Sequence, residues 1–398
     1  MLYNPRMHRL GAVKNIMREI TAYGQRRAAE IGAENVLDFS MGSPNAPVPA
    51  QVDDTIRAVL DSPLAATVHG YTAAQGDNGV RAALAESHCR RFNTKVSAQD
   101  FYLTVGAAAA LCSCLSGLTV EGDEFICVVP YFAEYSVFIE SAGAKVVEVP
   151  ATPVTFDLDI DAIEKAITPH TKGVLINSPN NPTGVIYSAE TLTALGEMLR
   201  RASEKKGEPI FLITDEPYRE LVFDGIEVPW VPSFYDNTIV CYSYSKCLSL
   251  AGERIGYVLV PPTVTDHDGV YAAVAGGGRS LGYINAPSLF QYVIAACDGL
   301  NADLTTYRTN RDLLYENLTA MGFTCVKPQG TFYLIMKSPD PDAVAFSREA
   351  MARDLLFPPT DTFGLPGYVR IAFCVSTDRV HRALPVFRAL AEKYGLCK

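Results

Sequence analysis

Short apolar runs rich in β-branched and aromatic residues alternate with helical stretches between about residue 100 and residue 260. The seven runs are FYLTV, EFICVV, KVVEVP, GVLINS, IFLIT, TIVCYSYS and IGYVLV, and ETLTALGEMLRRASEKKG is one of the helical stretches. Continuously apolar strands separated by helices are typical of a mainly parallel sheet covered on both faces. We therefore predict an α/β core with a seven-stranded sheet and helices on both faces.

The C-terminal part of the chain has a different pattern. Residues 300–398 carry more helix, in TYRTNRDLLYENLTAMG, PDAVAFSREAMARDLL and RVHRALPVFRALAEKYG, around the short strands TFYLIMK and GYVRIAFCV. This pattern predicts a smaller α+β domain. The N-terminal segment opens with a helical stretch and ends in the proline-containing connector DFSMGSPNAPVP. We expect a large domain over residues 46–285 and a small domain made of residues 1–45 and 286–398.

Composition excludes several classes of protein. The 398 residues are 48% hydrophobic and 20% charged, which is a globular composition and not a disordered one. The net charge is -10 with no stripe of Lys and Arg, so nucleic acid is not an expected partner. The most apolar long run, GAAAALCSCLSGLTV, is too short to cross a bilayer, and the N-terminus lacks the pattern of a signal peptide. We expect a cytoplasmic protein without a membrane partner.

The ten cysteines do not form a metal-binding pattern. They are scattered along the chain, the closest pair is Cys112 and Cys114, and there is no CxxC motif or neighbouring histidine cluster. Reduced and mostly buried thiols are therefore expected, with no metal site.

Candidate functional residues follow the predicted strands, and in open α/β sheets ligands bind beyond the carboxyl ends of strands. Gly106 directly follows a strand and opens an alanine-rich helix, which suits either phosphate binding or close packing. Asp215 ends another strand, with Tyr218 three residues later. An acidic residue in this place is either a helix cap or a partner for a cationic ring.

Two further segments raise the same choice between structure and function. SPNNPTG, residues 178–184, reads as a turn, but asparagines held between prolines could also direct an amide toward a ligand. In CYSYSKCLSLAGERIGYV, Lys246 follows a strand and Arg254 comes eight residues later. Two cations beside an apolar segment require partners, because burying an unpaired charge is costly.

Taken together, these motifs resemble one family. SPNNPTG, DEPY, SYSK followed by GERIG, and YVRIAF occur in the order and rough spacing found in the class I and II aminotransferases, which are fold-type I enzymes that use pyridoxal 5'-phosphate (PLP). The similarity covers essentially the whole chain, and five motifs in register are far more specific than any one of them. The resemblance implies the fold-type I architecture and PLP as cofactor.

The resemblance gives partners to both cations. Lys246 is similar to the lysine that forms a Schiff base with the PLP aldehyde and later acts as general base. Arg254 is similar to the arginine that pairs with the cofactor phosphate, and Ser243 to the hydroxyl that assists it. Asp215 resembles the aspartate that keeps the pyridine nitrogen protonated.

The remaining cofactor contacts are also implied by the family. Asn181 and Tyr218 resemble the donors to the phenolic oxygen of PLP. Phe132 occupies the place of the stacking aromatic residue, which in the family is often Trp or Tyr.

The phosphate cradle is implied at Gly106, Ala107 and Ala108. The family frequently has a hydroxyl or another polar side chain in this segment. With alanines alone, only backbone amides are left to bind the phosphate there.

Substrate contacts and assembly follow from the same resemblance. Arg370 is similar to the arginine that binds the substrate α-carboxylate through a two-pronged contact, with Gly42 and Asn181 nearby. Tyr71 resembles the tyrosine that reaches the partner's phosphate in a homodimer.

The expected activity is PLP-dependent transfer of an amino group from an L-amino acid to a 2-oxo acid by ping-pong chemistry. Two alternatives stay open: a PLP-dependent lyase acting by β- or α,γ-elimination, and a non-catalytic ligand-binding regulator. The substrate also stays open. Arg279 could bind a distal carboxylate or be a surface residue, and Tyr131, Phe132 and Tyr135 could line a pocket or belong to the core.

Overall fold

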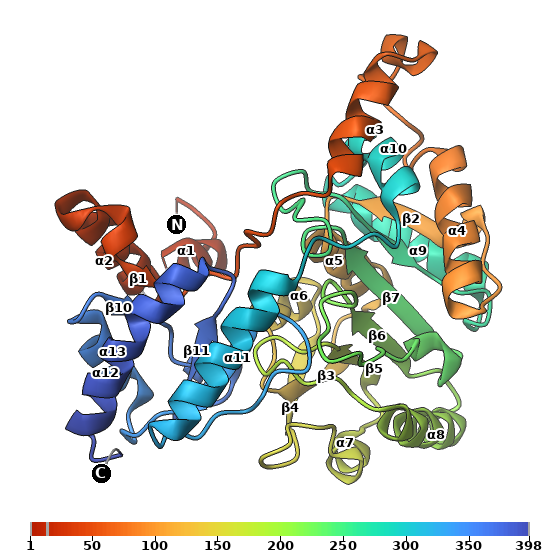
Figure 1. Cartoon of the computed structure of the whole chain (residues 1–398). Helices are drawn as coiled ribbons and strands as arrows, with labels where there is room; N and C mark the ends of the chain where they lie inside the picture. Colours follow the sequence, from red (N-terminus) through yellow and green to blue (C-terminus); the bar gives the residue numbers. More distant parts are fainter. Residues whose placement is uncertain (1, 13–15, 397–398) are drawn as a thin grey trace. The chain divides into compact units, whose positions relative to one another are not determined.

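The computed structural model describes residues 2–12 and 16–396, and the chain divides into two compact units (Figure 1). Unit 1 comprises Met1–Gly42, Thr306–Lys327 and Phe332–Lys398, and unit 2 comprises Ser43–Thr305 and Pro328–Thr331. These units are defined by packing alone. The functional domain limits expected at residues 45/46 and 285/286 stay a prediction.

Unit 2 is built on a seven-stranded sheet, which confirms the predicted fold class. Its strands are β2 (Phe101–Thr104), β3 (Glu124–Val129), β4 (Lys145–Pro150), β5 (Thr171–Asn177), β6 (Phe211–Asp215), β7 (Thr238–Ser243) and β8 (Gly256–Leu259). They lie in the order β2-β8-β7-β6-β5-β3-β4, and all neighbours are parallel except β8, which is antiparallel to both β2 and β7. Each strand coincides with one of the seven apolar runs.

The apolar runs fold into this sheet because both faces are buried. In β3, Phe125 and Cys127 belong to one hydrophobic cluster, whereas Ile126 and Val128 belong to a second cluster on the opposite face. Successive side chains of a strand point to opposite faces, so a strand between two cores must be apolar at every position.

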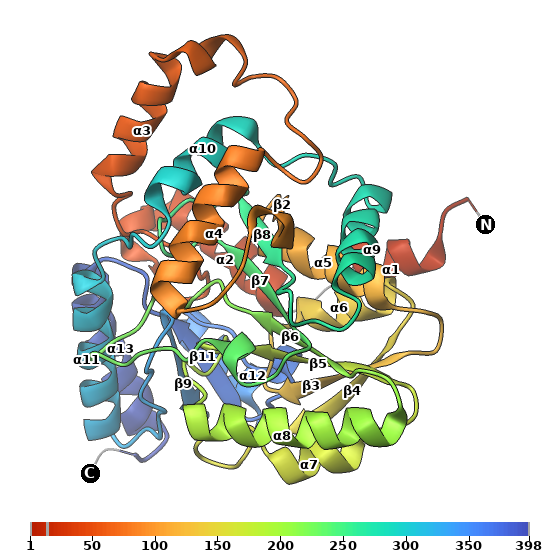
Figure 2. The same cartoon turned by 90° about the vertical axis from the view of Figure 1, so that its right-hand side faces the viewer.

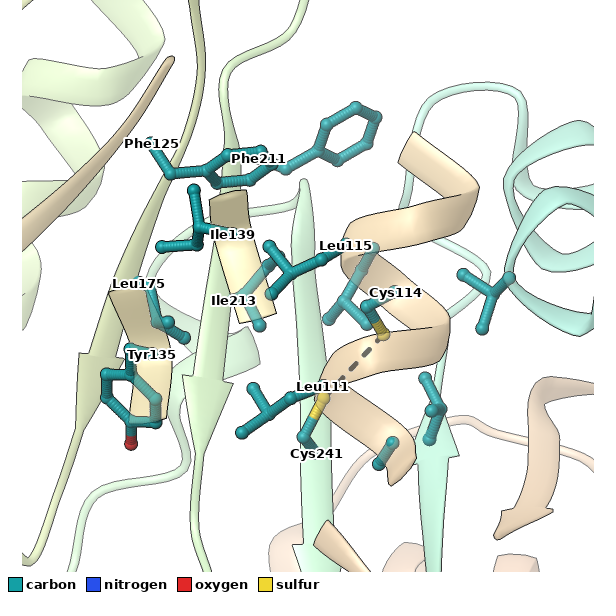
Figure 3. Close-up of a cluster of buried hydrophobic side chains, with 14 of the residues drawn as sticks. Leu111, Cys114, Leu115, Phe125, Tyr135, Ile139, Leu175, Phe211, Ile213 and Cys241 are labelled. Atoms are coloured by element: carbon teal, nitrogen blue, oxygen red, sulfur yellow. Dashed lines mark hydrogen bonds between the residues drawn. The ribbon is translucent and has the colours of Figure 1, made fainter. Parts of the chain in front are cut away.

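Helices cover both faces of the sheet. One cluster includes residues of α5 (Ala107–Leu118), α6 (Glu134–Ser141) and α9 (His267–Ser280), and the other includes residues of α7 (Ile160–Ala166) and α8 (Ala189–Lys206). Figure 2 shows the two groups of helices on opposite sides of the strands. Figure 3 shows α5 directing Leu111, Cys114 and Leu115 toward Ile213 and Cys241 of the sheet. The three remaining helices of unit 2 are α3 (Ala50–Leu60), α4 (Asn78–Phe92) and α10 (Ser288–Cys297).

Unit 1 is the smaller α+β part of the chain. Its helices are α1 (Pro5–Ala12), α2 (Ile16–Ile31), α11 (Thr305–Ala320), α12 (Ala343–Met351) and α13 (Thr377–Lys393). Its strands form two pairs: β1 (Leu37–Asp38) with β10 (Leu355–Leu356), which are parallel, and β9 (Tyr333–Lys337) with β11 (Tyr368–Ala372), which are antiparallel. β9 and β11 fall within the predicted strands TFYLIMK and GYVRIAFCV.

Two observations concern the cysteines and the helix lengths. The nine cysteines in the described part of the chain are all free and mostly buried, and Cys397 lies outside the described residues. Among the described helices, none combines the length and the apolar character needed to cross a bilayer.

Two glycines within helices offer a test of the packing of unit 2. Gly196 in α8 is buried, and an alanine there would collide with the carbonyl oxygen of Phe234; Gly276 in α9 has no atom within 4 Å of the added carbon. We expect Gly196→Ala to lower the free energy of unfolding by about 1–3 kcal/mol through overpacking. Gly276→Ala should instead leave it unchanged or raise it by up to about 1 kcal/mol, because alanine favours helix. Urea denaturation of both variants measures the difference, and equal effects would contradict this packing.

Candidate active site

The carboxyl ends of β5, β6 and β7 meet at one edge of the sheet because these neighbouring strands are parallel. They end at Asn177, Asp215 and Ser243, and all three residues are buried. Asn177 pairs in register with Asp215, and its Nδ2 donates a hydrogen bond of 2.7 Å to the Asp215 carbonyl oxygen. Three buried polar residues are therefore gathered on this edge, and two of them, Asp215 and Ser243, are among the predicted site residues.

Asp215 presents a buried carboxylate at this edge. The residue is only 5% exposed, and the Tyr135 hydroxyl donates a hydrogen bond of 2.5 Å to its Oδ2. Its Oδ1 has no hydrogen-bond partner among the described residues. Burial raises the pKa of Asp215 from its ordinary value of 3.8 to about 7, the hydrogen bond from Tyr135 lowers it, and the neighbouring Glu216 raises it. The carboxylate therefore has one oxygen engaged and one oxygen open.

The SPNNPTG turn is fixed to the same edge. Asn177 Oδ1 accepts a hydrogen bond of 2.7 Å from the backbone N–H of Asn181, so one side chain ties this turn to β5 while its amide contacts the end of β6. Asn181 itself is buried. The backbone at Asn181 is thus fixed by a strand residue that the motif does not contain.

Lys246 lies in the loop that follows β7. Its side chain is half-buried, and its Nζ lies 5.8 Å from the centre of the Tyr218 ring. The next residue, Cys247, anchors the loop: its carbonyl oxygen accepts from the Ala302 N–H at 2.6 Å, and its Sγ lies 3.2 Å from the Tyr242 hydroxyl. Contacts of both the backbone and the side chain of Cys247 therefore hold the loop that carries Lys246.

A cation lies over the start of α5. A side-chain carbon added to Gly106, which has φ +93°, would approach Arg254 Nη2 to 2.6 Å. Arg254 donates hydrogen bonds to the carbonyl oxygens of Ala251 (2.9 Å) and Val105 (3.3 Å). A guanidinium beside the open N–H groups of a helix start can bind an anion.

The exposure of Arg254 corrects one expectation from the sequence. We expected both Lys246 and Arg254 to lie where burial would make an unpaired charge costly. Arg254 is exposed, however, and of the two only Lys246 is half-buried. The reason is that Arg254 lies in the turn before β8 begins, and not within an apolar strand.

The other predicted cofactor residues are less enclosed. Ala107 is half-buried and Ala108 is exposed at the first turn of α5. Phe132 is half-buried and meets the Tyr135 ring edge to face, with centroids 5.7 Å apart. Tyr71 is 95% exposed and lies away from any core of unit 2. Arg279, for which the sequence left two roles open, is exposed in the last turn of α9.

The predicted substrate residues Gly42 and Arg370 belong to unit 1. The Arg370 guanidinium contacts two aromatic rings, 4.3 Å from the centre of Tyr333 and 4.8 Å from the centre of Phe363. Its Nη2 donates to the Ser40 carbonyl oxygen at 3.0 Å. Gly42 lies against the same tyrosine, because any side chain at this position would collide with the Tyr333 hydroxyl. The structure thus brings Gly42 and Arg370 together around Tyr333.

Sequence reasoning missed three residues of these constellations: Tyr135, Asn177 and Tyr333. The interpretation of Tyr135 left pocket and core open, and the structure shows a buried hydroxyl that is bonded to Asp215. Asn177 had a detectable signal, since it is a polar residue at the end of an otherwise apolar strand. Tyr333 had none, because an aromatic residue in TFYLIMK reads as ordinary core.

Comparison with known proteins identifies the family. Residues 34–387 match the family described as aminotransferase class I and II. The chain therefore belongs to the class I and II aminotransferases, a family of enzymes that use PLP. The fold class, the family and the aminotransferase activity predicted from the motifs are confirmed.

Individual relatives and solved structures agree with this assignment. The chain is 30% identical over 374 residues to the aspartate/prephenate aminotransferase of Thermus thermophilus, which covers 91% of this chain and 93% of the relative. A solved amino transferase from Eubacterium rectale is 50% identical, with a TM-score of 0.96 and 99% of both chains covered. The solved aspartate aminotransferase from Thermus thermophilus with maleate is 28% identical, with a TM-score of 0.84 over 98% of this chain and all of that one.

The raised pKa of Asp215 predicts how the cofactor-free protein responds to pH. Between about pH 4 and pH 7 the folded state retains a proton that the unfolded chain releases, so this contribution to stability is present at low pH and is lost as the pH rises. Asn cannot titrate. The free energy of unfolding of the parent protein should therefore fall relative to that of Asp215→Asn across this range. Denaturant titrations at several pH values measure it, and a constant difference would contradict the assigned shift.

Proposed function

We propose that this aminotransferase binds PLP in unit 2, with the ε-amino group of Lys246 bonded to the aldehyde carbon of the cofactor. The observation that carries the proposal is the buried carboxylate of Asp215, whose Oδ1 has no partner within the described part of the chain. A buried acceptor without a partner is costly unless a ligand satisfies it. The cationic ring nitrogen of PLP is a donor of the required kind.

The anion-binding arrangement fits the other end of the same cofactor. Arg254 Nη2 and the backbone N–H groups at the start of α5 would bind the phosphate, with Ser243 adding a hydroxyl. Thr104, Gly256 and Ser243 lie in one register row across β2, β8 and β7. This row supports a common location for Ser243 and the anion site, because Gly106 lies two residues after the end of β2 and Arg254 lies two residues before the start of β8.

When bound, PLP supplies a protonated conjugated ring that can accept the electron pair left on the substrate when its α-proton is removed. Asp215 would hold the proton on the ring nitrogen, and pairing with this cation would lower the pKa of the carboxyl below its value in the unpaired site. Asn181 and Tyr218 would donate to the phenolic oxygen.

Lys246 would then act as the general base. When it is not bonded to the cofactor, the Nζ of Lys246 would be free to accept the α-proton of the substrate and to deliver it to the cofactor carbon. The loop anchored at Cys247 restricts where this amine can move, and the Tyr218 ring lies 5.8 Å from it. A short, restrained transfer path is what such proton movement requires.

Arg370 would bind the α-carboxylate of the substrate. Contacts with two aromatic rings restrain the guanidinium, and a restrained guanidinium presents two parallel N–H donors to a carboxylate. Amino acids and 2-oxo acids share this carboxylate. The same arginine can therefore serve both halves of an amino-group transfer, which supports ping-pong transamination with Gly42 near the bound acid.

We further propose a homodimer in which Tyr71 reaches the partner's phosphate site. Tyr71 is 95% exposed, and the exposed Ile284 lies on an adjoining loop, which is joined to it by a hydrogen bond of 2.8 Å from Asn285 Nδ2 to the Thr72 carbonyl oxygen. Large exposed apolar side chains on adjoining loops are typical of a contact surface.

The free cysteines of the described chain support a reducing compartment such as the cytoplasm.

The first test locates the bond to the cofactor. Reduction of the PLP-loaded protein with borohydride followed by peptide mapping should place the cofactor label on Lys246. Borohydride makes the bond between the cofactor and its lysine permanent, so only that lysine carries the label. Lys246→Ala should lose transamination between amino acids and 2-oxoglutarate by several orders of magnitude while keeping its thermal unfolding temperature. A label on another lysine, or near-normal turnover in the variant, would refute the proposed role.

The second test concerns the crossing of Tyr71 between subunits. Light scattering should give about twice the chain mass of 43.2 kDa. Tyr71→Ala and Lys246→Ala should each be weakly active or inactive. After the two variants are mixed and allowed to exchange subunits, activity should rise, because one site of each mixed dimer has an intact lysine and receives an intact tyrosine. No rise after verified exchange would place Tyr71 in its own subunit's site or outside it.

A further inference from the structure

Tyr135 is the described side chain that bonds directly to the carboxylate of Asp215. It lies in α6, and its hydroxyl donates to Oδ2 at 2.5 Å while Oδ1 stays open among the described residues. The residue is fully buried, within the cluster that packs between the sheet and its helices (Figure 3). A phenol and a carboxylate at this distance form a strong, charge-assisted hydrogen bond.

We propose that Tyr135 is a positioning residue that selects which oxygen of Asp215 serves the cofactor. It holds Oδ2 and leaves Oδ1 to bind the ring nitrogen of PLP. This inference rests on the proposed role of Asp215 and deepens it. A carboxylate without such an anchor can rotate and present either oxygen, so it would bind a donor less tightly.

The electrostatic surroundings of Asp215 give Tyr135 a second consequence. Burial raises the pKa of the carboxyl, and the adjacent Glu216 raises it further, whereas the hydrogen bond from Tyr135 lowers it. The Tyr135 hydroxyl keeps its own proton, because burial and Asp215 raise the pKa of the phenol well above its usual value. It therefore donates to the Asp215 carboxylate, and it favours the charged form that a cationic ring needs.

The packing around Tyr135 explains how it keeps its place. The Tyr131 ring stacks on it, with centroids 6.0 Å apart and an interplanar angle of 6°, and Phe132 meets it edge to face. A ring confined in this way keeps its hydroxyl at one position, and the segment that carries these residues follows directly from the end of β3.

A cofactor analogue separates positioning from general structural support. In 1-deaza-PLP a C–H replaces the ring nitrogen, so this compound cannot use Asp215 Oδ1. Equilibrium titration of the cofactor-free protein should show that the parent chain binds PLP more tightly than the analogue. Tyr135→Phe should weaken PLP binding by about ten-fold or more, as expected for the loss of a hydrogen bond to a charged group. Binding of the analogue should be unchanged.

Tyr131→Phe is the matched control. It removes the neighbouring hydroxyl, which bonds to Glu148 and not to Asp215, and it keeps the stacked ring. We expect the affinities for both compounds to stay at the parent level in this variant. Thermal unfolding of each cofactor-free protein shows whether it is folded.

The outcomes distinguish this inference from the proposed function. If the parent protein binds both compounds equally, the proposed role of Asp215 fails. A second outcome is that the parent protein binds PLP more tightly than the analogue, while Tyr135→Phe weakens the binding of both compounds equally or of neither. In that case the positioning role of Tyr135 is wrong.

A second measurement covers a variant that does not fold. In the parent chain the Tyr135 hydroxyl proton should resonate at low field and shift when PLP binds, but not when the analogue binds. A proton signal that responds equally to both compounds would overturn the inference.

Discussion

The hydrogen bond between Tyr135 and Asp215 is the interaction on which the candidate site depends. A carboxylate buried at the end of β6 would take up a proton if burial acted alone, and a neutral acid could not stabilise a cationic ring. The phenol offsets part of this cost from one side, and the Asn177 amide fixes the backbone from another. The other oxygen is left with an incomplete hydrogen-bond set, so the site is prepared for a donor that arrives with the cofactor.

The seven strands of unit 2 could be predicted from the sequence because the physical signal is local. A strand buried on both faces must be apolar at nearly every position, and the seven runs combine that pattern with flanking turns and helices. The strand ends were visible for the same reason. Asp215 and Lys246 stand out as polar residues that directly follow an apolar run, and the topology then places them on one edge.

Contacts that join distant segments could not be predicted in this way. Tyr135 and Asp215 are 80 positions apart, and their contact depends on how α6 packs against the sheet. The exposure of Arg254 depends on where the chain turns before β8, and a motif does not specify burial. Likewise, residues Pro328–Thr331 pack with unit 2, although the segments on both sides of them belong to unit 1. Backbone hydrogen bonds to Gly184 and Leu221 hold them there, and no periodicity in the sequence reveals these bonds.

The reversed direction of β8 has a consequence for how the site is encoded. Because β8 runs against β7, the chain leaves the edge of the sheet and returns to it within one loop, which carries Lys246 and ends beside Arg254. A parallel connection would have had to carry the chain to the opposite end of the sheet before the next strand could begin. Lys246 and Arg254, for which we propose a bond to the cofactor and anion binding, therefore lie on one contiguous peptide, and an insertion or deletion in this loop would alter the spacing of both groups at once.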